Sequence, residues 1–379
     1  MKINWKTVNW TGVLFLSLTP IAAIVLTIYH LRTEGFLWPI WLLAAVFYTL
    51  TASSITGGYH RYFSHRTYEA RPWLKWYWSL FGAAAFQNSI FIWARDHRVH
   101  HRFVDTDRDP YSINKGFYFA HFGWMLSNQG PDVDLKTYGR DLERDPIVMF
   151  QHKHYTALAI AVGFVAPTVI GYFLGSALGG LAVAGFLRIV VLHHMTFFIN
   201  SWCHCFGSQR YTDSNTAKDS FLMAVATFGE GYHNFHHYFA NDYRNGIRWY
   251  HWDPTKWMIQ LFRLMGGAYN LRRTPSSEIM KAQMLMDERR LKLELSHNWG
   301  EQLQQQLDSL KIKVESSYVR WEQLREEYKQ MASTYAQSKM ERYQELKFQL
   351  QMAKIEFRAA VEQWRAYNSF LMQMQAVRA

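Results

Sequence analysis

Four long apolar runs constrain this chain more than any other feature of its sequence. The runs at 10–29, 36–56 and 155–187 contain no Asp, Glu, Lys or Arg, and the run at 181–202 contains only Arg188. A glycine-rich break at 175–180 divides the last two. Each run reaches the roughly 20 residues that a helix needs to cross the hydrocarbon core of a bilayer. The sequence therefore predicts an all-α integral membrane protein with four transmembrane helices in two close pairs.

The distribution of basic residues predicts the topology. The links at 30–35 and 175–180 are short and contain one Lys or Arg, Arg32, whereas 57–154 and the chain from 203 onward are rich in both. By the positive-inside tendency, both large segments and both termini lie on the cytoplasmic side. A fifth apolar stretch, 73–93, is expected to be buried or interfacial, because a fifth crossing would separate the histidines that flank it.

Nine of the 17 histidines gather at the cytoplasmic ends of the predicted spans. In two of the groups the spacing i, i+3, i+4 places three imidazoles on one helix face, so all the groups are expected to converge. Imidazole binds Zn, Cu, Fe and Ni, and nine ligands suit two ions of coordination four or five. Zinc has no redox chemistry, so a histidine-rich pair favours O₂ activation on iron. The nine are His60, His65, His97, His100, His101, His204, His233, His236 and His237.

Other reactive side chains are given structural roles. His193 and His194 precede His204 by roughly 15 Å along a helix, so packing or hydrogen bonding is expected of them. The two cysteines, Cys203 and Cys205, exclude a disulfide framework and are expected to be small buried thiols. The net charge of +11 comes without a compact Lys/Arg run or a nucleic-acid motif. It indicates basic loops beside anionic membrane lipid, and no nucleic-acid partner.

Five ordered motifs within residues 10–272 carry a resemblance to a known family. They are "TGGYHRYFSHRTYEARP", "AFQNSIFIWARDHRVHHRF", "GFYFAHFGWML", "NSWCHCFG" and "GEGYHNFHH". With them the chain resembles the membrane-bound fatty acyl desaturases, most closely the stearoyl-CoA (Δ9) type without a fused cytochrome b5 domain. The resemblance implies a desaturase domain over 1–274, in which four transmembrane helices carry a cytosolic cap with a histidine-rich di-iron site.

The resemblance also implies an activity and a set of site residues. Two iron ions would be held by the nine histidines, with Asn200 reaching one of them through a water. With O₂ as co-substrate, the site would introduce a cis double bond, at Δ9, into a saturated long-chain acyl group. Gln87, Trp93 and Thr196 would line the bend of the substrate tunnel. The positions that contact the CoA portion correspond to Asn88, Arg95 and Asp96.

Several alternatives stay open. After "GW" in the third motif the family often has a basic pair for the CoA phosphates, whereas this chain has Ser127, Asn128 and Gln129. Acyl-CoA is still favoured, and phospholipid-bound chains or acyl-carrier protein are alternatives. A histidine-box lipid hydroxylase and a non-catalytic scaffold are the competing functions. No haem domain or nucleotide fingerprint occurs in the sequence, so ferredoxin, rubredoxin or cytochrome b5, with a reductase, is expected to supply electrons.

The C-terminal residues 275–379 differ from the rest. From residue 278 onward they contain no proline and one glycine, and their apolar residues follow a 3–4 spacing. This pattern predicts a helical, coiled-coil-like extension. It could fold into a helical hairpin, self-associate or bind the electron donor. Its predicted seam is Leu303, Leu307, Leu310, Val314, Trp321, Leu324, Tyr328, Met331, Tyr335, Leu346, Leu350, Phe357, Trp364 and Leu371.

Overall fold

The computed structural model describes residues 5–128, 130–294, 301–333 and 340–376. The chain divides into two compact units, Met1–Thr274 and Pro275–Ala379. The first unit contains the apolar runs and all the histidines of the predicted site, and the second contains three helices.

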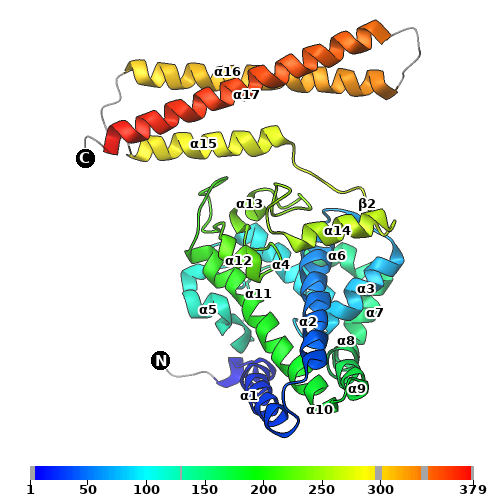
Figure 1. Ribbon diagram of the computed structural model, residues 1–379. Helices are drawn as coiled ribbons and strands as arrows, with labels where there is room; N and C mark the ends of the chain where they lie inside the picture. The colour runs from blue at the N-terminus through cyan, green and yellow to red at the C-terminus, as the bar shows by residue number, and fades with distance from the viewer. Residues whose placement is uncertain (1–4, 129, 295–300, 334–339, 377–379) are drawn as a thin grey trace. The chain divides into compact units, whose positions relative to one another are not determined.

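Among the described residues, four helical spans are long and apolar enough to cross a membrane, which confirms the predicted number. The first part of the fourth span, η6, packs against α1, α2 and α9, so this span lies between the other three (Figure 1). Three spans contain π-helical turns. The spans are α1 (Trp10–Thr33); α2 (Trp38–Ser53) with η2 (Ser54–Ser64); α8 (Tyr155–Ile160), η5 (Ala161–Val165) and α9 (Ala166–Phe173); and α10 (Ala177–Gly179), η6 (Gly180–Leu187) and α11 (Arg188–Cys205).

The two short links between paired spans touch each other. Ser176 Oγ lies 3.4 Å from His30 Nδ1, and His30 Nδ1 lies 3.1 Å from Glu34 Oε2. Ser176 also donates a hydrogen bond to Glu34. These contacts place both links on one side of the molecule, as the predicted topology requires.

The fifth apolar stretch does not form a span. It is divided between α3 (Pro72–Ala83) and α4 (Ile90–Phe103), and the turn between them holds Phe86 and Asn88 at positive φ. Leu74 and Trp78 of α3 are fully buried, as predicted. The chain enters this stretch from β1 (Glu69–Ala70), which pairs antiparallel with β2 (Ala268–Tyr269).

Short helices complete the first unit around the end of the second span. Asp134, Asp145, Ser220 and Asp253 each cap one of them, since their side chains accept a hydrogen bond from a backbone N–H of the first turn. These elements are η1 (Trp5–Thr7), η3 (Ile113–Lys115), α5 (Phe117–His121), η4 (Gly123–Leu126), α6 (Leu135–Glu143), α7 (Pro146–Lys153), α12 (Phe221–Ala226), α13 (His233–Tyr238) and α14 (Pro254–Leu264).

The second unit consists of α15 (Ser276–Glu294), α16 (Glu301–Ser333) and α17 (Met340–Ala376). Helices α16 and α17 are antiparallel, because Arg320 pairs with Glu356 and Gln306 with Tyr367. Of the alternatives, the hairpin is therefore the arrangement within this unit. Tyr335 and the side chain of Leu303 lie outside the described part, and the other predicted seam residues are buried or half-buried. The fully enclosed core is Met284, Leu307, Val314, Ala360, Trp364 and Leu371.

A buried ion cluster joins the second span to the loops around α13. Arg61 Nη2 donates to Glu230 Oε1 at 2.8 Å and to Asp253 Oδ1 at 2.9 Å, and all three side chains are almost fully buried. Asn245 Nδ2 donates to the second oxygen of Glu230 at 2.7 Å. Each charge is therefore compensated by a partner, and removal of one leaves the others uncompensated.

We expect Arg61→Met to lower the free energy of unfolding by about 3–5 kcal/mol, because it leaves two buried carboxylates without their cation. Thermal denaturation of the purified protein in detergent measures the loss. Arg263→Met is the matched control, since the Arg263 side chain is exposed; it should change stability by less than about 0.5 kcal/mol. Equal melting temperatures for the two variants would contradict the role given to Arg61.

Candidate metal centre

The π-helical form of η2 aligns the first two histidines. His60 and His65 are five residues apart, and the N–H of His65 donates to the carbonyl of His60 at 3.2 Å. An i→i+5 pattern brings these residues to one side of the helix, which an α-helix would not do. Their ring centroids are 4.9 Å apart.

The nine predicted histidines form two clusters, in line with the expectation of two ions. The five-histidine cluster consists of His60, His65, His97, His101 and His236, and the four-histidine cluster of His100, His204, His233 and His237. Within each, the candidate ligand atoms all lie within 4.8 Å of one another. The histidine groups therefore converge, and each triplet is divided between the two clusters.

Helix geometry explains the division. In an α-helix, residue i+4 lies about 40° from residue i, while i+3 lies about 60° to the other side. His97 and His101 accordingly join one cluster, and His100 joins the other. Helix α13 follows the same rule, with His233 and His237 together and His236 apart.

The spacing of the Nε2 atoms fits metal coordination. In the five-histidine cluster, Nε2 of His60 lies 2.9 Å from that of His236, which lies 3.0 Å from that of His101. In the other cluster, Nε2 of His233 lies 3.1 Å from those of both His204 and His237. Imidazoles bound at about 2.1 Å from one ion have neighbouring nitrogens about 3 Å apart.

The hydrogen bonds of the other ring nitrogens also fit a metal site. His60 Nδ1 lies 2.8 Å from Glu230 Oε2, and His100 Nδ1 lies 2.9 Å from Asp109 Oδ1. A carboxylate only accepts, so Nδ1 donates to it and Nε2 is the nitrogen that faces the cluster. In the part of the chain that the structure describes, the buried His100 Nε2 has no hydrogen-bond partner. Ring nitrogens that face each other fit a metal ion, and the residues thus suit the predicted centre.

The pKa values of the cap histidines agree with this. Burial lowers each of them well below the usual range, and neighbouring imidazoles lower them further. These rings are therefore neutral at pH 7, which is the form that binds metals. The histidines whose pKa is lowered in this way are His65, His97, His101, His233, His236 and His237.

The two clusters are immediate neighbours. The rings of His101 and His237, one from each cluster, stack with centroids 4.3 Å apart and planes 13° apart. His100 and His237 lie 5.1 Å apart edge to face. Two ions held by these clusters could act on one small molecule between them.

One loop after α4, residues 104–111, orients histidines of both clusters. Asp105 accepts from the Thr216 hydroxyl at 2.7 Å, and Thr216 Oγ1 lies 2.7 Å from His204 Nδ1. The N–H of Asp105, whose φ is +64°, donates to Asp109 at 3.1 Å, the carboxylate that holds His100. The hydroxyl of Tyr111 lies 3.1 Å from His97 Nδ1.

The acidic groups of this second layer are ionised. Burial alone would raise the pKa of Asp109, but His100 and the N–H groups of Tyr111 and Asp105 lower it below the ordinary value. Burial likewise opposes ionisation of Glu230, and the pKa of Glu230 is nevertheless lowered by His60 and Arg61. Both carboxylates therefore act as acceptors for the imidazole N–H groups.

The structure brings the three predicted tunnel residues close to the centre or to each other. Trp93 stacks on His97 at 4.9 Å and meets His60 edge-on at 6.1 Å. Gln87 Nε2 donates to Thr196 Oγ1 at 2.8 Å, and among the described residues Gln87 Oε1 has no hydrogen-bond partner. Gln87 lies between Phe86 and Asn88, whose positive φ angles are a form of backbone strain common at functional sites.

The predicted headgroup residues and Asn200 have other surroundings. Asn88 is exposed, and its N–H donates to the Tyr155 hydroxyl at 3.0 Å. Arg95 and Asp96 pair with each other at 2.8 Å, and both are half-buried. Asn200 is half-buried on α11, one turn before His204. Their roles toward substrate and metal stay predictions.

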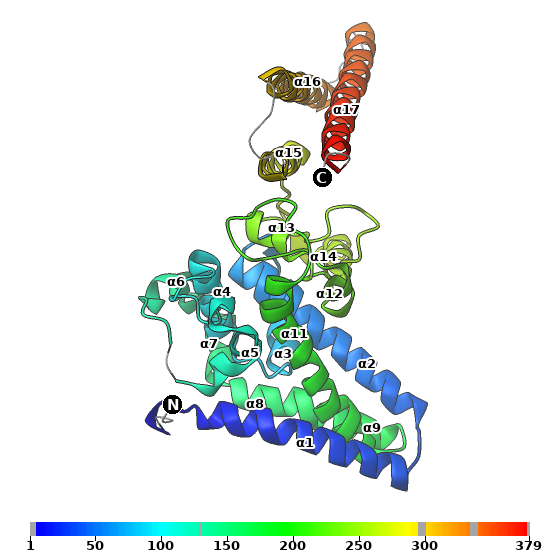
Figure 2. The same cartoon turned by 90° about the vertical axis from the view of Figure 1, so that its left-hand side faces the viewer.

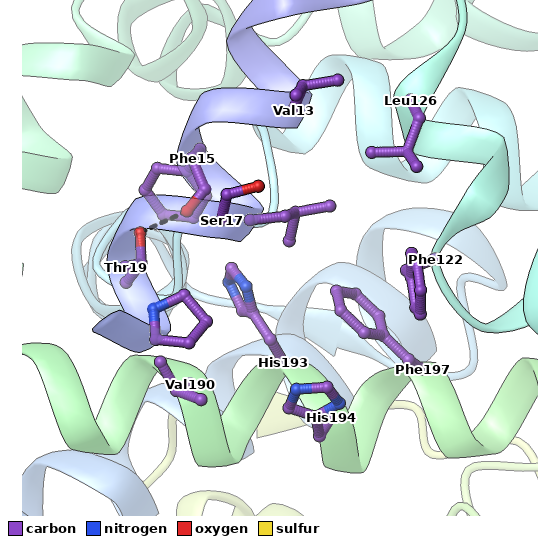
Figure 3. Close-up of a pocket in the computed structure, with 12 residues that line it drawn as sticks. Val13, Phe15, Ser17, Thr19, Phe122, Leu126, Val190, His193, His194 and Phe197 are labelled. Carbon is purple, nitrogen blue, oxygen red and sulfur yellow. Dashed lines mark hydrogen bonds between the residues drawn. The ribbon is translucent and has the colours of Figure 1, made fainter. Parts of the chain in front are cut away.

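A separate cavity of about 220 Å³ lies between α1 and α11. Figure 3 shows His193 and His194 beside Phe197 and Phe122 in its wall. His193 Nε2 lies 2.8 Å from the carbonyl of Ala85, and His194 Nδ1 lies 3.2 Å from His121 Nε2. The predicted hydrogen-bonding role of the two is therefore confirmed. Cys203 is buried and Cys205 half-buried, and neither belongs to a cluster.

Several residues of the site were missed by the sequence analysis. Glu230 stands inside the fifth motif, three residues before His233, and its charge beside an apolar region was a usable signal. The stretch "VDTDRDPY", which contains Asp105, Asp109 and Tyr111, begins three residues after His101. For Thr216, 12 residues beyond His204, the sequence offers no comparable sign.

Comparison with known proteins agrees with this geometry. The family described as "Fatty acid desaturase" matches residues 36–272. The chain is 43% identical over 311 residues to a "Probable acyl-CoA desaturase" of Schizosaccharomyces pombe, covering 80% of this chain and 63% of that one. It is 42% identical to "Acyl-CoA desaturase 1" of Saccharomyces cerevisiae, covering 69% of this chain and 52% of that one.

An "Acyl-CoA Delta12-desaturase" of Acheta domesticus is 41% identical, with 61% of this chain and 66% of that one covered. The chain thus spans less than two thirds of the length of the two yeast relatives. The family match alone includes more than half of the chain, the three spans from α2 onward and every histidine of the two clusters. The chain belongs to the fatty acid desaturase family.

Proposed function

We propose that this chain is an acyl-CoA desaturase, an oxidoreductase that introduces a cis double bond into a saturated long-chain acyl group. The convergence of nine imidazoles from η2, α4, α11 and α13 carries the proposal, supported by the family match. The reaction consumes O₂, two electrons and two protons. Two hydrogens leave the acyl chain, and two waters form.

The nine histidines are proposed to hold two iron ions, five at one position and four at the other. Asn200, one turn from His204, is proposed to reach the four-histidine position through a water. Iron bound there would supply the oxygen chemistry that removes the hydrogens. The chain itself orients the ligands: Glu230, Asp109 and Tyr111 fix His60, His100 and His97.

The tunnel residues are proposed to position the acyl chain. Successive methylenes are chemically alike, so the position of the double bond must follow from the shape of the channel. The Gln87–Thr196 hydrogen bond and the Trp93 ring against His97 are rigid features on which such a channel can be built. Resemblance to the stearoyl-CoA type favours Δ9, although one relative is named for Δ12.

Acyl-CoA is the proposed carrier, because the names of the relatives specify it. Asn88, Arg95 and Asp96 are proposed to contact the CoA portion. A phospholipid-bound acyl chain is the alternative substrate, since Ser127 and Asn128 stand where phosphate-pairing cations were expected. A lipid hydroxylase is the alternative activity, and it would add one oxygen where a desaturase removes two hydrogens.

The active site and termini are proposed to face the cytoplasm. An external donor, such as ferredoxin, rubredoxin or cytochrome b5 with its reductase, would supply the electrons there. Self-association through α15–α17 is a further proposal from the sequence pattern.

The first test is fatty-acid analysis of a desaturase-deficient host that expresses the chain. We expect a new cis monoene from the wild type. In His236→Ala the yield of this product should fall at least about 100-fold, because loss of a metal ligand weakens metal binding more than loss of a residue that orients a ligand. Mass spectrometry of derivatised esters locates the double bond. His154→Ala is the control, since His154 is exposed and belongs to neither cluster.

Each outcome of this test is decisive. Desaturation retained in His236→Ala would refute the ligand assignment. A hydroxylated chain would favour the alternative activity. No new lipid, with the protein in the membrane and a competent donor present, would count against the whole proposal.

A second prediction concerns the loop 104–111. Asp105→Asn should weaken metal retention by roughly 10–100-fold, because Thr216 loses the carboxylate that orients it toward His204. Asparagine tolerates the positive φ of Asp105, so the backbone is preserved. Iron per chain is measured by mass spectrometry after titration with a chelator. Asp107→Asn is the control, since Asp107 is exposed in the same loop. Equal metal loss in both variants would contradict the role of Asp105.

A third prediction concerns the tunnel. Thr196→Ala removes the hydroxyl that Gln87 binds and should change chain-length preference or lower kcat, and Trp93→Ala should widen the channel beside His97. Product spectra with a series of saturated acyl-CoA substrates of increasing chain length measure both. Thr49→Ala, on the exposed face of α2, should behave as wild type. An unchanged spectrum for both site variants would remove them from the tunnel.

A further inference from the structure

Two short helices of the cap expose large apolar side chains. On α12, Phe221 is 69% and Leu222 62% exposed. On α14 and just after it, Leu264 is 85% and Met265 61% exposed. An exposed apolar surface of this kind, rather than single scattered residues, marks contact with another apolar phase.

The exposed residues of α14 lie on one face of an amphipathic helix. Trp257, Leu261 and Leu264 follow the spacing i, i+4, i+7, and all three are exposed. The opposite face buries Ile259 and Phe262 in the core of the first unit. Two faces of the helix therefore carry apolar residues, and among the described residues of this unit only one of these faces has a protein partner.

Hydrogen bonds to the second span show at which depth these helices lie. The hydroxyl of Tyr48 donates to the carbonyl of Ala226 at the end of α12, at 3.4 Å. The hydroxyls of Thr56 and Thr255, the latter in the first turn of α14, are 2.7 Å apart. Tyr48 and Thr56 both belong to the uncharged run 36–56 of the second span. Elements that touch this run lie at the level of the bilayer or its boundary.

The pictures agree with this placement. Figure 2 shows α12 and α14 beside the upper part of α2 and α11. Trp249 and Trp252, in the loop before α14, are exposed as well. Tryptophan is the residue that accumulates at the boundary between acyl chains and headgroups.

We propose that the exposed faces of α12 and α14 are immersed in one leaflet of the membrane, with lipid acyl chains as their partner. These helices would lie in the interface plane rather than cross it. This surface would continue the lipid-facing surface of α2, where Leu42 and Val46 are exposed. It would hold α13, which carries His233, His236 and His237, against the bilayer. The bilayer is the source of apolar chains. The proposal does not depend on the metal or on the reaction.

A spin label tests the environment directly. Leu222→Cys and Leu264→Cys are labelled separately with a nitroxide in the full chain, in lipid nanodiscs, and the signal of the labelled wild type, which contains Cys203 and Cys205, is subtracted. Collision with O₂, which concentrates in acyl chains, is compared with collision with a water-soluble nickel chelate. Arg140→Cys, an exposed position on α6, is the control.

We expect the ratio of O₂ to nickel collisions at positions 222 and 264 to exceed that at 140 several-fold. A ratio equal to that of the control would place the faces in water and overturn the proposal. Immobile labels that neither reagent reaches would show that protein covers the faces, either a second copy or residues 275–379, and would overturn it too. Size-exclusion profiles that match the wild type show that the labelled variants are folded.

Discussion

The metal centre depends on the close approach of imidazole nitrogens from several elements. Nδ1 of His60 and of His100 faces a carboxylate, so Nε2 of each ring is the nitrogen that faces its cluster. Protons on the protein can bridge some of the Nε2 pairs that lie about 3 Å apart, but His236 Nε2 has two such neighbours and one proton at most. Only cations satisfy the whole arrangement, and the second layer of acidic residues exists to hold the rings in that orientation.

The charges around the clusters fit this requirement. Glu230, Asp253, Asp109 and Asp105 contribute four carboxylates, and Arg61 is the cation that pairs with two of them. Arg98 and Lys218 are further cations close to the histidines. Bound metal ions would bring more positive charge to the rings that these carboxylates hold. The same residues thus stabilise the fold and prepare the binding site.

The sequence was sufficient for features that depend on composition and local spacing. The four spans followed from long apolar runs whose one charge is Arg188, and the helical form of the C-terminal extension from the 3–4 spacing of Leu307, Val314, Trp364 and Leu371. The hairpin was one of several alternatives that this spacing left open. The nine histidines stood out because so many imidazoles at span ends have no ordinary structural use. The division into five and four did not follow, since it depends on the π-helical turn at His60–His65 and on the relative rotation of α4 and α13. The link from His204 through Thr216 to Asp105 joins residues about 110 positions apart, and only the folded chain shows it.

The inequality of the two clusters is itself informative. Five imidazoles would surround one ion more completely than four would surround the other, and His237 stacks against His101 where the two clusters meet. Trp93, which lies over His97 and edge-on to His60, closes the five-histidine cluster with an apolar wall. An apolar substrate could lie along such a wall. The four-histidine position would leave more room for a further ligand, because fewer imidazoles would hold its ion.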